Sequence, residues 1–190
     1  MARIVISTNS SLDGIVQDPD GREGTEQGGW FGRSGGADIE PLFALLLQEA
    51  LGAEALLLGR RTDRWFAERW LTRTGAFADR LNGMPKYVVS STLENPEWNS
   101  TVLHGDVVEE VSKLKQRVGG DIVVFASGRL VHTLMEHDLV DELRLMIYPF
   151  VLGGGERLFG ETTDRKPLRL IAARTVGHGL NLLTYQPVRR

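Results

Sequence analysis

The sequence predicts a single α/β domain whose mixed, mostly parallel β-sheet ends in an antiparallel hairpin. Over roughly residues 1–140, short apolar segments rich in Val, Ile and Leu alternate with helical patterns, which is typical of parallel strands covered on both faces. Later, two strand-like segments flank Gly177, His178 and Gly179, a pattern that indicates a hairpin with a glycine-permitted turn. We therefore expect one domain spanning residues 1–190.

Six segments before the hairpin have the length and composition of strands. Each is short, apolar and bounded by Gly, Pro, Asn or Asp. They are "RIVIS" (3–7), "ALLL" (55–58), "KYVVSS" (86–91), "TVLH" (101–104), "DIVVFAS" (121–127) and "ELRLMIYPFVL" (142–152). The hairpin itself is expected within residues 168–188.

Three segments between these strands have helical patterns. Residues 38–51, beginning at Asp38, are apolar, with Pro41 in the first turn and Gly52 just past the end, as helices prefer. Residues 106–118 repeat apolar side chains at spacings of three and four, and residues 130–137 form a shorter helix. The remaining long connection, the glycine-rich stretch 18–36, has a length typical of functional lids or of disordered segments.

Composition and charge exclude several classes of function. The chain has no cysteine, which rules out disulfides and thiol nucleophiles, and its four histidines are too scattered to suggest a metal site. A net charge of -3 without clusters of Lys or Arg argues against a nucleic-acid partner. No apolar run approaches the roughly 18 residues of a membrane span, and the start of the chain does not read as a signal peptide. We expect a cytoplasmic protein.

Three predicted strands end in residues suited to an anion. The segments are Leu58 to Thr62, Val89 to Thr92 and Phe125 to Leu130, and each places Gly, hydroxyl or Arg side chains directly after a buried strand. Ligands of open α/β sheets bind at the carboxyl ends of strands, where glycines and helix N-termini suit phosphate. Taken singly, each end is equally explained by turns, helix caps and surface arginines. Neither the Rossmann fingerprint nor the P-loop is present.

The succession of these motifs resembles a known family. "SLDG", "LLLGRRT", "YVVSST", "FASGRLVHTL" and above all "LVDELRLMIYPFVLGGGERLF" are similar to the dihydrofolate-reductase-like superfamily, and within it to the group of the riboflavin-biosynthesis reductase (RibD C-terminal domain). The resemblance runs from about Arg3 to Tyr185. It implies a three-layer α/β/α sandwich and an NADPH-dependent reductase acting on a small-molecule substrate.

The resemblance also implies where the cofactor binds. Gly59, Arg60, Arg61 and Thr62 would meet its phosphates and adenosine ribose, and Ser90 and Ser91 would lie by the 2′-phosphate. Gly128, Arg129 and Leu130 would cover the pyrophosphate through backbone N–H groups. Cationic and hydroxyl donors suit the extra phosphate of NADPH, whereas NAD sites offer a carboxylate to the ribose.

Hydride transfer to a C=N or C=O bond also needs a proton, which makes two carboxylates near strand ends interesting. Asp13 in "SLDG" and Glu156 in "GGGE" are the catalytic candidates, to orient the substrate or to help deliver the proton. Both residues are equally explained as turn formers. Trp30 and Phe31, in the glycine-rich stretch, either fold over a flat ring or anchor the loop to the core.

The chain also departs from its relatives. Asp38 and Glu40 lie too close to Gly59 to match the acid of true dihydrofolate reductases. Without cysteine the chain cannot supply a zinc deaminase site. A basic pocket for a ribose phosphate would depend on Arg22, Arg33 and Arg157, each also explained as a surface charge.

Three functions stay open. The first is reduction of a small heterocycle, in the manner of 5-amino-6-(5-phosphoribosylamino)uracil reductase. The second is an NADP-binding module without efficient turnover, and the third is a true dihydrofolate reductase. Related domains pair as homodimers, and the apolar segment 142–152 would contribute to such an interface or else lie in the core.

Overall fold

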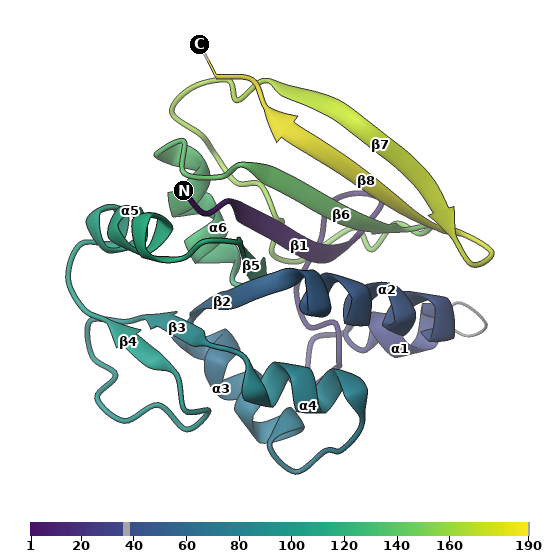
Figure 1. Cartoon of the computed structure of the whole chain (residues 1–190). Helices are drawn as coiled ribbons and strands as arrows, with labels where there is room; N and C mark the ends of the chain where they lie inside the picture. Colours follow the sequence, from purple (N-terminus) through teal and green to yellow (C-terminus); the bar gives the residue numbers. More distant parts are fainter. Residues whose placement is uncertain (36–38, 190) are drawn as a thin grey trace.

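The computed structural model describes residues 1–35 and 39–189 and confirms the α/β class. In this part of the chain the strands form one sheet in the order β4-β3-β2-β5-β1-β6-β8-β7 (Figure 1). The strands are β1 (Ile4–Ser11), β2 (Ala53–Gly59), β3 (Lys86–Val89), β4 (Thr101–Leu103), β5 (Asp121–Phe125), β6 (Glu142–Tyr148), β7 (Leu168–Val176) and β8 (Leu180–Pro187). The helices are α1 (Trp30–Gly35), α2 (Ile39–Gly52), α3 (Arg60–Trp70), α4 (Ala76–Gly83), α5 (Val107–Arg117) and α6 (Gly128–Glu136).

The sheet is parallel from β4 to β6 and antiparallel in the hairpin, as predicted. β1 lies between β5 and β6 and pairs in parallel with both. β8 runs antiparallel to β6, and β7 runs antiparallel to β8 at the edge of the sheet. β6, which the sequence left open as an interface or core strand, is an interior strand.

Helices cover both faces of the sheet, which gives three layers. Neighbouring residues of a strand point to opposite faces, so Ile4 and Ile6 of β1 pack with α5 and α6. Val5 of the same strand packs with side chains of α2, α3 and α4 on the other face. Figure 1 shows α5 and α6 on one side of the sheet and α2, α3 and α4 on the opposite side.

The boundaries of the elements have local causes. α5 begins after Asp106, whose carboxylate accepts hydrogen bonds from the N–H groups of Val108 and Glu109 and so caps the helix. β6 ends at Tyr148 because Pro149 has no N–H to continue a ladder. Asp38, the expected first residue of the helix that became α2, lies outside the described residues. α1, α3 and α4 were not predicted.

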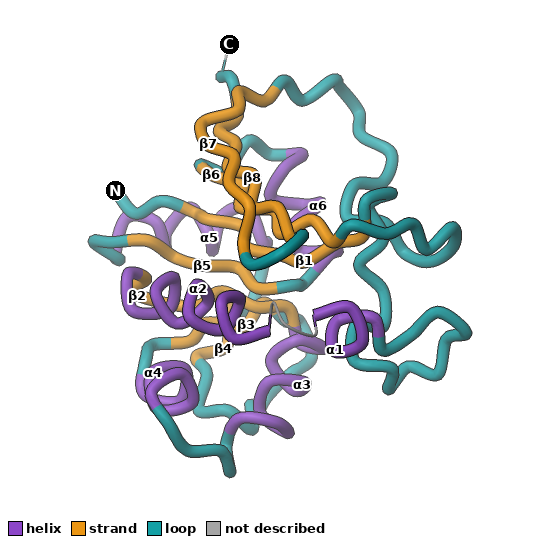
Figure 2. Tube along the Cα trace, turned by 90° about the vertical axis from the view of Figure 1, so that its right-hand side faces the viewer, coloured by secondary structure: helices purple, strands orange, loops and turns teal. Residues whose placement is uncertain are grey.

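The glycine-rich stretch is a folded loop built around Asp18. This fully buried carboxylate accepts hydrogen bonds from the N–H groups of Glu23 and Thr25. Gly28 lies so close that a Cβ there would meet the carboxylate oxygen at 2.1 Å, so only glycine fits. In Figure 2 the long connections gather on one side of the sheet, beside α1.

Trp30 anchors this loop to the core. Its ring is 3% exposed, packs edge-on against Tyr148 at 5.2 Å between centroids, and donates from Nε1 to the carbonyl of Gln17 at 2.8 Å. Phe31 packs beside it, also against Tyr148. Of the two interpretations left open by the sequence, the anchoring role is the one observed.

None of the described helices combines the length and the apolar character that crossing a membrane requires.

Candidate functional site

The carboxyl ends of five neighbouring strands lie at one edge of the sheet. Because β3, β2, β5, β1 and β6 are adjacent and parallel, the segments that follow them are brought side by side. These segments contain every site residue expected from the sequence. The structure thus assembles the three predicted anion-binding ends and both catalytic candidates at one place.

Two helices begin at this edge without side-chain caps. Gly59 precedes α3 and Ser127 precedes α6, and neither provides a cap hydrogen bond. The Oγ atom of Ser127 is otherwise engaged, since it accepts from the N–H of Gly59 at 3.1 Å and donates to the carbonyl of Phe125 at 3.0 Å. The first N–H groups of a helix have no partner within it, so both N-termini offer donors to an anion. α5, by contrast, is capped by Asp106.

A tight left-handed turn positions the start of α6. Ala126 and Ser127 have φ angles of 48° and 56°, a region that costs a residue with a Cβ about 1–2 kcal/mol. The chain leaves β5 and enters α6 within these two residues. The turn brings the start of α6, and with it Gly128, Arg129 and Leu130, next to Gly59, which is hydrogen-bonded to Ser127. Backbone strain of this kind concentrates at functional sites.

Arg60 connects two of the strand ends. Its Nη1 donates to Oγ1 of Thr92 at 2.8 Å, which ties the start of α3 to the turn after β3. That turn is organised by Ser90, whose Oγ accepts from the N–H groups of Thr92 and Leu93. Ser91, in the same turn, is exposed.

The remaining expected cofactor residues differ in availability. Arg61 is exposed and its Nη2 lies 3.6 Å from a carboxylate oxygen of Glu23 in the glycine-rich loop. Arg129 is exposed, and its guanidinium makes no hydrogen bond or ion pair with any described residue. Leu130 is 7% exposed and belongs to the core, so it offers only its backbone. Thr62 is half-buried in the first turn of α3.

Asp13 holds the loop after β6 in place. Its carboxylate accepts hydrogen bonds from Oγ of Ser11 at 2.6 Å and from the N–H groups of Leu152 and Gly153 at 3.1 and 2.9 Å. The hydrogen bond from Ser11, followed by those from the backbone, lowers the pKa of Asp13 from 3.8 to about 2. A carboxylate with this pKa is ionised at neutral pH and has no proton to give. The geometry favours positioning over proton delivery.

Glu156 lies beside the start of α6. An ideal Cβ on Gly128 would be 3.7 Å from its Oε1, so the carboxylate faces the N-terminus of the helix, a favourable place for a negative charge. Its N–H donates to Oε1 of Gln17, and its carbonyl accepts from Val16. Asp13 and Glu156 therefore belong to one connected loop system at this edge.

Two of the three arginines considered for a ribose-phosphate pocket have described side chains, and they make separate contacts. Arg157 donates to the carbonyl of Asp13 at 2.8 Å, and the exposed Arg22 lies 3.9 Å from Asp20. The side chain of Arg33 lies outside the described part of the chain. Within that part, no three His, Cys, Asp or Glu side chains are grouped as metal ligands.

Sequence reasoning did not single out Thr92 and Ser127 as site residues. Both stand in the strand-end segments, but nothing in a single sequence says that Thr92 would receive Arg60 or that Ser127 would join Gly59. The only available signal was their position directly after a strand.

Comparison with protein families identifies a match over nearly the whole chain. A family model described as the RibD C-terminal domain matches residues 2–182. Two proteins of Bacillus subtilis, both described as uncharacterized, are similar: YyaP is 36% identical over 105 residues and YwjB is 35% identical over 71 residues. These matches cover 55% and 37% of this chain, and 56% and 41% of the relatives, so the chain spans about half the length of the curated relatives it matches.

Solved structures share the fold. A putative riboflavin biosynthesis protein from Shewanella sp. PV-4 superposes with a TM-score of 0.76 at 22% identity, over 98% of this chain and 99% of that one. A pyrimidine reductase-like protein from Corynebacterium diphtheriae gives 0.69 at 14% identity, over 99% and 92%. Dihydrofolate reductase from Enterococcus faecalis, complexed with NADP(H), gives 0.60 at 14% identity, over 97% and 96%.

Proposed function

The chain belongs to the RibD C-terminal domain family, and from that membership we propose that it is an NADPH-dependent reductase of a small heterocyclic substrate. The observation that carries the proposal is the pair of uncapped helix starts joined by the hydrogen bond from Gly59 to Ser127. Two N-termini on adjacent strands suit an extended ligand that has two phosphates in a row.

The residues at this edge fit the cofactor. The N–H groups of Gly128, Arg129 and Leu130 would receive the pyrophosphate, aided by those of Arg60, Arg61 and Thr62. Arg60, Ser90 and Ser91 would bind the 2′-phosphate, where a guanidinium can form paired hydrogen bonds to oxygen. When bound, NADPH supplies the hydride, and the chain supplies orientation and a site shielded from water.

Proton delivery falls to Glu156 in this proposal. Asp13 is saturated with hydrogen bonds and ionised, and it fixes the Leu152 and Gly153 backbone that leads to Glu156. Glu156 lies close to Gly128, where the cofactor would pass. Its carboxylate would orient a water that carries the proton to the substrate.

The names of the relatives support a choice of candidate substrates. The names of the similar structures refer to riboflavin biosynthesis, pyrimidine reduction and dihydrofolate reduction. We propose a pyrimidine such as 5-amino-6-(5-phosphoribosylamino)uracil as the first substrate to test, and dihydrofolate as the second. An NADP-binding module without efficient turnover is the alternative outside enzymology.

Loss of NADPH absorbance with each substrate tests the proposal, alongside thermal unfolding with and without NADPH. Oxidation of NADPH with either substrate supports a reductase and names its class. Stabilisation by NADPH without turnover of any substrate favours the binding module. If NADPH does not stabilise the fold at all, the proposed cofactor is wrong.

We also propose that the chain forms a homodimer through β7. The interior position of β6 removes it as an edge-to-edge interface, whereas β7 has an open hydrogen-bonding edge. Leu170 and Ile171 on this strand are 52% and 46% exposed. Light scattering of the native chain and of a Leu170→Lys variant tests this surface. Loss of the dimer in the variant supports it, and a native monomer refutes it.

A further inference from the structure

A cavity opens at the opposite edge of the sheet, away from the proposed cofactor site. Its volume is about 400 Å³, within the roughly 300–1,000 Å³ usual for small-molecule sites. It lies between the end of α2 and strands β2, β5, β6, β7 and β8. Ala53 and Asp121, which line it, are the first residues of β2 and β5, so it belongs to the amino ends of the parallel strands.

The strand register explains why polar side chains meet here. Arg144 pairs with Ser7 of β1 on one side and with Thr184 of β8 on the other. Directly paired residues point to the same face, so these three side chains form a row under α2. Arg174 of β7 pairs with Leu182 of β8, and both line the cavity.

Glu49 brings a buried carboxylate to this row. It stands on the inner side of α2, in line with Leu42 and Leu45, and its side chain is only 6% exposed. Ser7 donates to Oε2 at 2.7 Å, while Oε1 has no hydrogen bond to a described residue and lies 3.6 Å from Nη1 of Arg144. Burial raises the pKa of Glu49, opposed by Ser7 and by the positive charges of Arg144 and Arg174. A buried oxygen without a donor is costly and calls for one.

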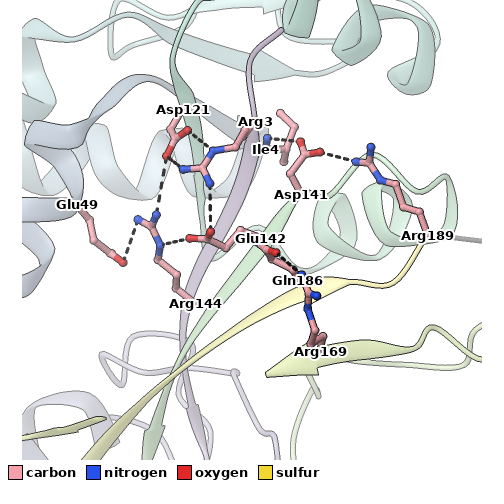
Figure 3. Close-up of polar contacts among 10 residues, drawn as sticks. All are labelled: Arg3, Ile4, Glu49, Asp121, Asp141, Glu142, Arg144, Arg169, Gln186 and Arg189. Atoms are coloured by element: carbon pink, nitrogen blue, oxygen red, sulfur yellow. Dashed lines mark hydrogen bonds and ion pairs between the residues drawn. The ribbon is translucent and has the colours of Figure 1, made fainter. Parts of the chain in front are cut away.

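The two arginines at the cavity differ in what they already bind. Arg144 lies among three carboxylates, with Nε donating to Glu142 at 2.7 Å and Nη2 lying 3.8 Å from Asp121 (Figure 3). Asp121 and Glu142 are held in turn by Arg3. Arg174 is exposed at the cavity and has no hydrogen bond or ion pair with any described residue. Its five N–H donors are available to an incoming anion.

We propose that this cavity is a second ligand site, which binds a small organic acid that also carries an amino or hydroxyl donor. Arg174 binds the acid group, and Oε1 of Glu49 accepts from the donor. Leu45, Val123 and Leu182 supply the apolar wall between these polar ends. Arg144 keeps Glu49 in place and does not compete for the acid, because its own charge is already balanced.

Titration calorimetry on the full chain tests the site with defined probes. 4-Aminobenzoate joins a carboxylate to an amine and O-phosphoethanolamine joins a phosphate to an amine, so the two identify the preferred acid. Benzoate, which lacks the donor, should bind more weakly than 4-aminobenzoate. Arg174→Gln should lower the affinity for the preferred probe at least about tenfold, because a charge-assisted pair is lost. Arg169→Gln, on the same strand but outside the cavity, should leave it unchanged.

Glu49→Leu, which removes the accepting oxygen, should reduce the affinity for 4-aminobenzoate to that for benzoate, and thermal unfolding of the variant reports whether the fold persists. Arg174→Gln alters an exposed side chain, so it keeps the test valid even if the buried variant unfolds. The proposal is overturned if neither amine-bearing acid binds saturably, or if Arg174→Gln binds both as the native chain does. NADPH binding, measured in the same proteins, should not respond to Arg174→Gln, so failure of the reductase proposal is separable from failure here.

Discussion

Nη1 of Arg60 donates to Oγ1 of Thr92 at 2.8 Å, whereas its neighbour Arg61 turns to Glu23 in the glycine-rich loop. The two arginines are therefore not equivalent. Arg60 lies between the α3 N-terminus and the turn after β3, where a 2′-phosphate would approach. Arg61 is already opposed by a carboxylate.

The first prediction concerns this asymmetry. Arg60→Ala should lower the affinity for NADPH by about tenfold or more and the affinity for NADH by less than about twofold, since the lost guanidinium would bind the 2′-phosphate. Arg61→Ala should lower the affinity for NADPH less than Arg60→Ala does, because Glu23 already offsets the charge of Arg61. Fluorescence titration with both cofactors measures this difference. Equal losses of NADPH and NADH in Arg60→Ala would mean that the arginine has a structural role.

The second prediction separates the charge of Glu156 from its proposed chemistry. Glu156→Gln removes a negative charge from the start of α6, so NADPH should bind about two- to fivefold tighter. The same variant should lower kcat by about a hundredfold if the carboxylate orients the water that delivers the proton. Glu161→Gln, in the same loop, is the matched control for both measurements. Unchanged turnover in Glu156→Gln would remove Glu156 from the chemistry.

The third prediction is a pH dependence at Asp13. Because the folded state lowers its pKa from 3.8 to about 2, Asp13 contributes stability that is present above about pH 4 and lost as the pH falls toward 2. Thermal unfolding should therefore show native protein more stable than Asp13→Asn at pH 5, with the gap closing below pH 4. A gap that stays constant over this range would contradict the proposed hydrogen-bonding role.

The fourth prediction tests Trp30 as an anchor. Trp30→Ala should lower the free energy of unfolding by about 3–5 kcal/mol, because it empties a buried aromatic site. Phe159→Ala, which changes a 42% exposed ring, should stay within about 0.5 kcal/mol. Urea unfolding measures both. Normal stability of Trp30→Ala combined with a raised KM would instead identify a lid.

The fifth prediction concerns Lys86, a buried cation. Its Nζ donates to the carbonyls of Leu81, Asn82 and Met84 at the end of α4, and burial lowers its pKa. Lys86→Met should destabilise the fold by about 2–4 kcal/mol, since these carbonyls lose their donor. Lys113→Met, at an exposed site on α5, is the control and should leave unfolding in urea unchanged. A stable Lys86→Met would show that the carbonyls find other donors.

Sequence patterns predicted the elements whose apolar residues and caps match the burial of those elements in the fold. Buried parallel strands have near-continuous apolar runs, and α5 has both regular spacing and an aspartate cap. α3 was missed because its buried residues include Asp63, which interrupts the apolar pattern. Asp63 is acceptable there since Oγ of Ser100, far along the chain, donates to it.

The sequence predicted which strand ends form the candidate site, but not the side-chain contacts within it. Parallel strands bring their carboxyl ends together by geometry, so the shared edge followed from the fold class. The contacts from Asp13 to Gly153 and from Glu49 to Arg144 span about a hundred residues or more, and no local pattern encodes them. Glu49 did leave one signal, because it occupies the apolar side of α2 at a position where a leucine would continue the pattern.

The central place of β1 has a consequence for synthesis on the ribosome. This strand is among the first segments made, yet Ile4 pairs with Ile122 and Ser11 pairs with Tyr148. Its apolar side chains remain without their partners until most of the chain has been translated. A chain dominated by such distant pairings folds slowly and exposes apolar surface while nascent. We expect heterologous yield to depend more on translation rate and chaperone supply than on the stability of the finished fold.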